Sequence, residues 1–243
     1  MPPWGRRGTG APRRTPILAI ALLFLATPAA AKTLQVGPDL AFKTPSQAAA
    51  KAEDGDTIEI AAGEYFDCAV WRANRLTITG PVDPATPAVL SDAACNGKAL
   101  FVVAGADTTI RHLTFTRVRV PDGNGAGIRA EGRNLTVEHS RFVNNQVAIL
   151  AGDQPDGSIA LLDSQFARNG VCDGPHCLPS VLIGTLLRLR VERSSFTAGR
   201  GGEYLRAART DILASRFADG PAGVSTAHVG LAGGSIQVAD SSF

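Results

Sequence analysis

The sequence predicts an all-β, single-domain solenoid in which short parallel strands stack coil upon coil. The main observation is a segment that ends in phenylalanine and recurs along the chain, and the second is a helix-forming block ahead of the repeats. Self-similarity at a period of roughly 20 to 50 residues is the signature of repeat architectures. The copies are LTVEHSRF (135–142), IALLDSQF (159–166), LRVERSSF (189–196), TDILASRF (210–217), IQVADSSF (236–243) and a looser TTIRHLTF (108–115).

The spacing within and between these copies predicts the shape of one coil. Successive terminal phenylalanines lie 27, 24, 30, 21 and 26 residues apart. Apolar residues fall seven and five positions before each phenylalanine, as Leu135 and Val137 show, which is the alternation of a strand. A serine lies two positions before it, so the parity changes and the chain is expected to bend between two strands. The serines are Ser140, Ser164, Ser194, Ser215 and Ser241.

The third side of each coil is predicted in more variable segments. These are AGIRAEG (126–132), VAILAG (147–152), SVLIG (180–184) and EYLRA (203–207). Coils stacked at about 4.8 Å pair in parallel and place like side chains in ladders inside. The serine and phenylalanine columns are therefore expected to be structural.

A short helix is predicted to close the first coil, within a cap and first strand at residues 32–66. Thr44 is the expected N-cap, Pro45 the first helical residue and Gln47 the partner in a capping box. Asp54 and Gly55 are expected to end the helix, and DTIEIAAGEY (56–65) to begin the first strand. The coils are expected over residues 67–243. Because no capping segment follows Phe243, we expect the sequence to be a fragment that lacks its C-terminal cap.

Residues 1–31 are predicted to be a secretory signal peptide. Two arginine pairs precede the apolar run ILAIALLFLA (17–26), and TPAAA before Lys32 places the expected cleavage after Ala31. The run is shorter than the roughly 20 residues of a membrane span, and no later run would insert in a membrane. The twin-arginine route is an alternative because Arg13 and Arg14 directly precede the run, but the general secretory route is favoured. The mature protein is therefore expected outside the cell or in the periplasm.

The charge excludes a typical nucleic-acid-binding protein. Removal of the signal peptide takes the formal charge from +2 to −2, because four arginines leave with it. A nucleic-acid partner requires a basic face, and none is evident. The remaining scattered arginines are compatible with an acidic polysaccharide as partner. We expect a monomer.

The four cysteines of an exported chain are expected to form disulfides. The sequence alone permits three pairings. Cys172 and Cys177 in VCDGPHC are close enough to fix a short loop, which leaves Cys68 with Cys95. The alternative is a zinc site on Cys172, His176 and Cys177, but a fourth ligand and the usual spacing are missing.

Several segments together resemble right-handed parallel β-helix proteins of the pectate-lyase-like superfamily. The opening block LQVGP…KTPSQAAAKAEDGDTIEIAAGEY, the recurring LxVxxSxF segment and NGAGIRAEG carry this resemblance over nearly all of residues 33–243. The most similar group is one of exported bacterial β-helix repeat proteins of unassigned activity, on DCAVW (67–71), GKALFV (97–102), RVPDGNGAGIRAEG (119–132) and RAARTDI (206–212), and the likeness includes both cysteine pairs. The resemblance implies a right-handed parallel β-helix.

Tyr204 and Arg206 are the predicted site residues for substrate binding and for catalysis. In EYLRA the strand alternation turns Leu205 inward and these two outward, where they would hold a sugar ring and its carboxylate. In the resembled group a lysine and a serine stand where Tyr204 and Leu205 stand here, so the base expected for a lyase is missing and Tyr204 would have to replace it. An outward tyrosine and arginine on a solvated sheet is the structural alternative.

Asp122 and Asn124 in PDGNG (121–125) are further candidates for substrate binding. Their oxygen atoms would suit Ca²⁺, although two ligands do not make a site, and the same residues form a good turn. No metal or other cofactor is evident from the sequence, and calcium is the one that the resemblance leaves open.

Two functional classes follow. Many members of the superfamily cleave acidic polysaccharides, so the resemblance implies a lyase or hydrolase of uronate chains. The alternative is a non-catalytic β-helix that binds glycan or serves as a structural module with a degenerate site, since fold does not imply function. The absence of the lysine and of a carboxylate cluster favours the alternative, and the resemblance favours the enzyme.

Overall fold

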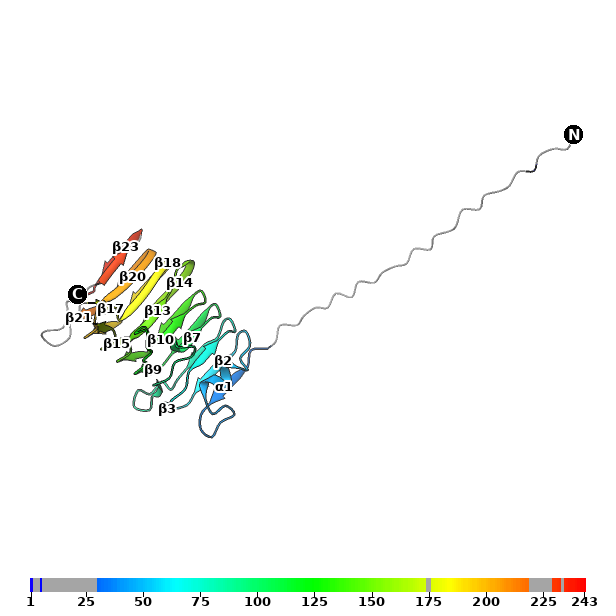
Figure 1. The fold of residues 1–243 in the computed structure, drawn as a ribbon, viewed down its shortest axis with the longest axis horizontal. Helices are drawn as coiled ribbons and strands as arrows, with labels where there is room; N and C mark the ends of the chain where they lie inside the picture. The colour runs from blue at the N-terminus through cyan, green and yellow to red at the C-terminus, as the bar shows by residue number, and fades with distance from the viewer. Residues whose placement is uncertain (2–4, 6–29, 174–175, 219–228, 233) are drawn as a thin grey trace. The chain divides into compact units, whose positions relative to one another are not determined.

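The protein is a right-handed parallel β-solenoid of about 8 turns, as the sequence predicts. The computed structural model describes residues 1, 5, 30–173, 176–218, 229–232 and 234–243. The body from Ala31 onward stacks its coils from α1 and β3 at one end to β23 at the other (Figure 1). The predicted signal peptide falls almost entirely outside the described residues. Among the described helices, none has the length and apolarity needed to cross a bilayer.

Each coil has three sides, which we call the first, second and third face. The first face corresponds to the variable segments predicted from the sequence. Its strands pair in parallel and in register, so that Phe101 lies beside Ile128 and Ile128 beside Ile149. They are β4 (Ala69–Trp71), β7 (Ala99–Val103), β10 (Ala126–Ala130), β13 (Val147–Ala151), the first parts of β18 (Val181–Glu192) and β20 (Glu203–Leu213), and β22 (Val229–Ala232).

The second face continues the same sheet, because β18 and β20 run through the corner between the two faces. Its inward residues are aliphatic, as Ile58, Ile78 and Ile110 show. Its strands are β1 (Thr33–Val36), β2 (Thr57–Ile60), β5 (Thr77–Thr79), β8 (Thr108–Arg111), β11 (Leu135–Glu138), β14 (Gln154–Leu162), the second parts of β18 and β20, and β23 (Ser235–Ala239).

The third face is a separate seven-stranded parallel sheet. It carries the phenylalanines at the ends of the predicted repeats. Its strands are β3 (Gly63–Tyr65), β6 (Ala88–Ser91), β9 (Leu113–Thr116), β12 (Arg141–Val143), β15 (Gln165–Ala167), β19 (Ser195–Thr197) and β21 (Arg216–Ala218).

The predicted phenylalanine column is a continuous stack inside the coil. Consecutive rings from Phe115 to Phe243 lie 4.5–5.0 Å apart and within 9° of parallel. At the N-terminal end the stack gives way to edge-to-face contacts among Trp71, Phe101 and Phe115. The column therefore forms the centre of the main apolar core.

The predicted serine column is a hydrogen-bonded ladder at the corner between the second and third faces. The N–H of Ser140 donates to Ser164 Oγ (3.2 Å), that of Ser164 to Ser194 Oγ (3.1 Å), and that of Ser194 to Ser215 Oγ (3.2 Å). Each hydroxyl in turn donates to a carbonyl two residues earlier, such as that of Glu138 (2.9 Å). The residue before each serine has a positive φ of 47–51°. This left-handed residue is the predicted bend.

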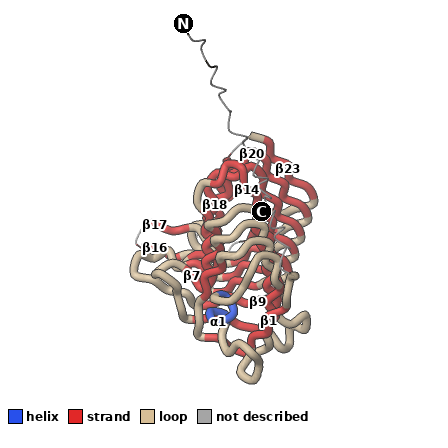
Figure 2. The backbone as a smooth tube through the Cα atoms, turned by 90° about the vertical axis from the view of Figure 1, so that its right-hand side faces the viewer, coloured by secondary structure: helices blue, strands red, loops and turns tan. Residues whose placement is uncertain are grey.

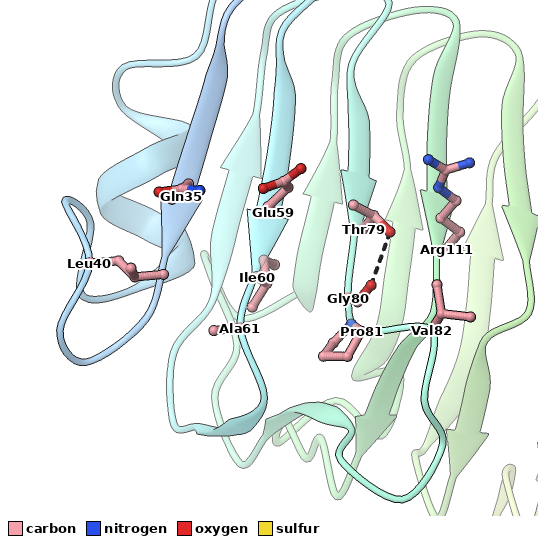
Figure 3. Close-up of a pocket in the computed structure, with 10 residues that line it drawn as sticks. All are labelled: Gln35, Leu40, Glu59, Ile60, Ala61, Thr79, Gly80, Pro81, Val82 and Arg111. Carbon is pink, nitrogen blue, oxygen red and sulfur yellow. Dashed lines mark hydrogen bonds between the residues drawn. The ribbon is translucent and has the colours of Figure 1, made fainter.

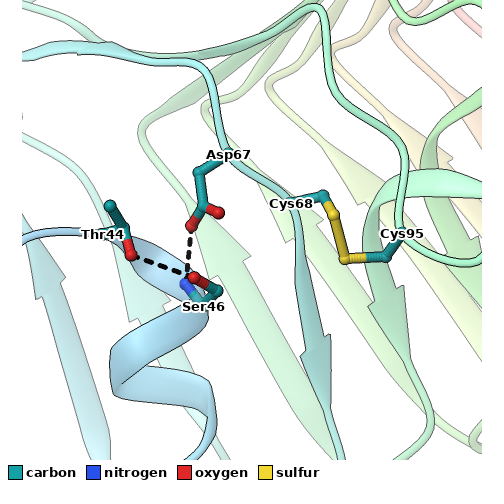
Figure 4. The surroundings of a disulfide bond; sticks show 5 residues. All are labelled: Thr44, Ser46, Asp67, Cys68 and Cys95. Atoms are coloured by element: carbon teal, nitrogen blue, oxygen red, sulfur yellow. Dashed lines mark hydrogen bonds between the residues drawn. A yellow bond between two sulfur atoms is a disulfide. The ribbon is translucent and has the colours of Figure 1, made fainter.

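The N-terminal helix α1 (Pro45–Ala49) has Thr44 as its N-cap residue and Pro45 as its first residue, as predicted, but its cap hydrogen bonds differ from the prediction. Thr44 precedes it in an extended conformation but makes no side-chain cap hydrogen bond. Asp67 Oδ2 instead accepts from the N–H of Ser46 (2.7 Å; Figure 4), and Gln47 Oε1 accepts from the N–H of Lys43 (2.8 Å). The helix also ends at Ala49, before the predicted stop at Asp54 and Gly55. The predicted capping-box hydrogen bonds were wrong, because a carboxylate 21 residues away takes the N–H of Ser46.

Both predicted disulfides are present, and the zinc alternative is therefore wrong. Cys68 and Cys95 join the start of β4 to the loop before β7, with Cα atoms 5.4 Å apart (Figure 4). Cys172 and Cys177 join the antiparallel hairpin of β16 (Val171–Asp173) and β17 (His176–Leu178). This hairpin stands at the margin of the stack (Figure 2). The disulfides are consistent with an oxidising compartment.

The phenylalanine stack yields a prediction for stability. Phe166 is 2% exposed and lies between the rings of Phe142 and Phe196. We expect Phe166→Ala to lower the free energy of unfolding by about 3–5 kcal/mol, because it leaves a cavity in the stack. Chemical denaturation followed by circular dichroism measures the change. Phe66→Ala is the matched control, since that ring is 68% exposed, and an equal loss in both variants would contradict a structural role for the column.

Candidate functional site

The outward surface of the first face carries a row of residues that is more apolar than is usual for a sheet that faces solvent. Parallel register places one residue of each strand in this row, which we call the first-face strip. An apolar outward row of this kind needs an explanation, because outward positions of exposed sheets are ordinarily polar. The strip consists of Val70, Val102, Arg129, Leu150, Leu182 and Tyr204.

The middle of the first-face strip belongs to a second apolar cluster outside the coil. Val102 and Leu150 are 1% and 8% exposed and pack with Ala99, Ala126 and Val147. Val70, Cys95 and Leu182 pack at the border of this cluster. Cys95 comes from the loop that the first disulfide fixes to β4, so that bond holds the edge of the strip in place.

Three charged side chains lie over the same surface. Lys98 Nζ lies 2.6 Å from Glu131 Oε1, and Arg129 Nε lies 3.9 Å from the same oxygen. Lys98 precedes β7 and Glu131 follows β10, so the lysine side chain runs along the outside of the face. All three side chains are 29–40% exposed. The cluster presents two cations and one carboxylate to a ligand.

Tyr204 and Arg206 lie at the C-terminal end of the strip in the predicted orientation. Tyr204 is 41% exposed, Arg206 is exposed, and Leu205 between them is fully buried. Arg206 lies near Asp153, whose pKa is held below its usual range by hydrogen bonds from Thr185 and, to a smaller extent, by the Arg206 charge. Asp153 is therefore an anion, and an acidic ligand would share Arg206 with it.

Asp122 and Asn124 do not join Tyr204 and Arg206. Their loop precedes β10, three strand positions from β20, which is about 14 Å at the spacing of paired strands. The loop is fixed by Gln146, whose Oε1 accepts from the N–H groups of Val120 (2.8 Å) and Gly125 (2.9 Å). Gly123 has a φ of 75° and lies beside the disulfide hairpin. Within the described residues, no group of three or more His, Cys, Asp or Glu side chains is placed to hold a metal ion.

Glu203 lies inside the coil directly next to Tyr204. It is 5% exposed and accepts a 2.5 Å hydrogen bond from Ser180 Oγ. Burial raises the pKa of Glu203 to about 6, against the opposing effect of that hydrogen bond. The strand alternation that turns Leu205 inward also turns Glu203 inward, so the sequence pattern of EYLRA contains the signal for its burial.

His112 and His139 lie away from this site. They stack at 5.0 Å on the corner between the second and third faces. Burial lowers the pKa of His112, and the charges of His139 and Arg111 add to this effect while that of Glu138 opposes it. His228 lies outside the described residues.

Comparison with known proteins gives a likeness of fold and none of sequence. No family model matches the chain, and no curated protein matches it. Among solved structures, a pectin methylesterase in complex with a hexasaccharide is similar with a TM-score of 0.57 and 13% identity, over 78% of this chain and 66% of that one. Escherichia coli YbhC is similar with a TM-score of 0.62 and 13% identity, over 96% and 75% of the two chains. Pectin methylesterase PemA from Erwinia chrysanthemi is similar with a TM-score of 0.55 and 14% identity, over 82% and 68%.

These comparisons establish the right-handed β-helix fold alone. The chain spans about two thirds of the length of the first of these structures. Two of the three neighbours are enzymes named for pectin, so the fold is one that polysaccharide-acting proteins use.

The arrangement suits recognition of an anion better than hydrolysis. Hydrolysis of a glycosidic bond requires two free carboxyl groups across the bond. The two carboxylates next to the strip are both engaged, Glu131 by Lys98 and Asp153 by the N–H of Thr185 (2.7 Å). Tyr204 and Arg206 are exposed next to the strip, whereas Lys98 and Arg129 would have to exchange Glu131 for a carboxylate of the ligand.

The buried carboxyl of Glu203 yields a prediction for pH dependence. Its pKa in the folded protein is higher than the ordinary value, so the folded state binds more protons than the unfolded state between pH 4.5 and about 6. Stability therefore falls as the pH rises through this window, by about 2 kcal/mol for a shift of this size. We expect Glu203→Gln to remove this component, measured as the difference in unfolding free energy from the wild type in urea at pH 4, 5, 6 and 7.

Glu59→Gln is the control, because Glu59 is an exposed carboxyl on the second face. It should leave the pH profile of the wild type unchanged. A Glu203→Gln profile parallel to that of the wild type would show that Glu203 does not titrate as its burial requires.

Proposed function

We propose that the protein is exported and binds an acidic, uronate-containing polysaccharide along the first-face strip. The observation that carries this proposal is the end of the strip, where the exposed ring of Tyr204 lies beside the exposed Arg206, with Arg129 in the same row three coils away. An aromatic ring packs against the C–H face of a sugar. A guanidinium forms bidentate hydrogen bonds with a carboxylate.

In this proposal Tyr204 and Arg206 bind the polymer at one end of the strip, and Arg129 and Lys98 meet it three and four coils away. Parallel strands place these groups in line along the stack, as an extended polymer requires. The polysaccharide-acting neighbours support a glycan ligand in general. The charge of the strip favours an acidic one.

A lyase reaction is the second candidate. Arg206 would neutralise a uronate carboxylate beside the phenol of Tyr204, a residue that is 41% exposed. Elimination also requires a base that removes the neighbouring proton. Tyr204 is the candidate for this base on the strip.

Binding is the first property to test. Purified protein is titrated with oligogalacturonate, oligoalginate and a glycosaminoglycan oligosaccharide, with and without Ca²⁺, by isothermal calorimetry. We expect binding to at least one of them, and roughly a 10-fold or greater loss of affinity for Arg206→Ala, because a hydrogen bond to a charged group is worth about 1.5–3 kcal/mol. Arg216→Ala is the control, since it removes an exposed arginine from β21 on the third face of the same coil.

Product formation separates the two candidates. Unsaturated uronate absorbance and new reducing ends are followed on the polymers that bind. Absorbance that Tyr204→Phe abolishes would establish the lyase, and binding without products would establish a glycan-binding protein. Failure of every acidic ligand to bind, or equal losses for Arg206→Ala and Arg216→Ala, would refute the proposal.

A further inference from the structure

A hollow on the outside of the second face lies away from the first-face strip. It encloses about 440 Å³ at the N-terminal coils. Polar side chains from four successive strands form one side: Gln35, Glu59, Thr79 and Arg111 (Figure 3). Leu40, Pro81 and Val82 lie along the other side, where the chain leaves the strands.

The polar side of the hollow has unused hydrogen-bonding capacity. Arg111 Nε is buried and has no hydrogen-bond partner among the described residues. The guanidinium also lies 3.7 Å from Glu138 on the next strand, so its charge is balanced. Glu59 is exposed and forms no ion pair within the part of the chain that the structure describes. These groups offer donors and acceptors with no net positive charge.

The other side of the hollow is apolar and accessible. Val82 is 76% exposed, which is unusual for a branched aliphatic side chain, and it stands beside Pro81 on the rim. An apolar rim opposite a row of hydrogen-bonding groups matches the two sides of a sugar ring, whose C–H face is apolar and whose hydroxyls are polar.

A row of threonines runs beside the hollow on the same outward surface. Five consecutive strands of the second face place a threonine at the same register position, and these residues form what we call the threonine row. At strand spacing its five hydroxyls repeat over about 19 Å. The row consists of Thr33, Thr57, Thr77, Thr109 and Thr136.

Strand propensity alone does not account for the threonine row. Threonine is favoured in strands generally, yet the same register position holds Ala160, Arg190 and Asp211 in the next three coils. There the surface is an ion-pair network, in which Asp211 lies 3.0 Å from Arg188 and 3.1 Å from Arg209. The hydroxyls are thus confined to the coils around the hollow.

We propose that the hollow and the threonine row form a second glycan-binding surface, specific for an extended neutral polysaccharide. The repeat of hydroxyls along the stack suits a linear polymer of sugar rings, which presents hydroxyls at a regular spacing. A neutral polymer is favoured because Glu59 would repel a uronate and the one arginine is balanced by Glu138. This surface is independent of the acidic ligand proposed for the first-face strip.

The test titrates purified protein with cellohexaose, xylohexaose and mannohexaose by isothermal calorimetry. We expect at least one to bind, and the double variant Thr77→Val, Thr109→Val to bind it at least 10-fold more weakly, because valine keeps the shape and strand preference and removes two hydrogen-bonding groups. Thr197→Val is the matched control on β19 of the third face and should bind as the wild type does. Tyr204→Ala should also leave neutral binding unchanged.

A second variant keeps the proposal falsifiable if the double variant is unstable. Glu59→Gln keeps the shape of the side chain and should weaken a neutral hexasaccharide several-fold, because an ionised acceptor forms the stronger hydrogen bond. Absence of binding for all three sugars at millimolar concentration would overturn the proposal. Loss of neutral binding in Tyr204→Ala, without loss in the threonine variant, would also overturn it. The same holds if an acidic oligosaccharide binds the hollow and Glu59→Gln raises its affinity.

Discussion

The structure depends on in-register parallel pairing between successive coils. Each strand forms its backbone hydrogen bonds with the strands one coil before and one coil after it, so the neighbour of a side chain is the residue at the same position of the next coil. Identical residues thereby become stacks, as the phenylalanine rings and the serine hydroxyls show. A change in coil length cannot disturb these columns, so it must be taken up in loops. The loop into the first face varies most, and it contains the disulfide hairpin.

The interior could be predicted from the sequence because its signal is local. An eight-residue pattern states which positions point inward and where the chain bends, and Phe142 and Ser140 occupy the predicted places. The cysteine pairs followed for a similar reason, since short separations leave few partners. None of these assignments requires knowledge of which residues pair between neighbouring coils.

The outside could be predicted only in part, because its neighbours come from different coils. The contact between Lys98 and Glu131 joins residues 33 positions apart, and the sequence does not show that separation to be one coil. The hydrogen bond from Ser46 of α1 to Asp67 likewise joins residues that are distant in the sequence. The hollow at Arg111 needs four strands and a loop in place. The outward orientation of Tyr204 and Arg206 could be predicted because it follows from alternation within one strand, and their role stays a prediction.

The same parallel pairing places different kinds of side chain in rows on the first and second faces. On the first face, the outward row is mostly apolar with Arg129 within it and Tyr204 at one end. On the second face, threonine hydroxyls repeat over five strands before ion pairs replace them. Because a ladder extends along the stack, each surface is linear. In the two proposals above, the sign of the charge along each row is what distinguishes an acidic from a neutral polymer.

The buried Glu203 connects the stability of the coil to the strip on its surface. In a solenoid each coil is stabilised mainly by its two neighbours. Burial of the Glu203 carboxyl therefore lowers the stability of the coils of β18 and β20, which enclose it. Local opening draws on the least stable part of a structure. These are the coils that present Tyr204 and Arg206, and a ligand that binds only the closed coil adds its binding free energy to their stability. A ligand on the strip would therefore offset the cost that ionisation of Glu203 imposes, and the occupancy of the strip and the protonation of the interior are linked through the same pair of strands.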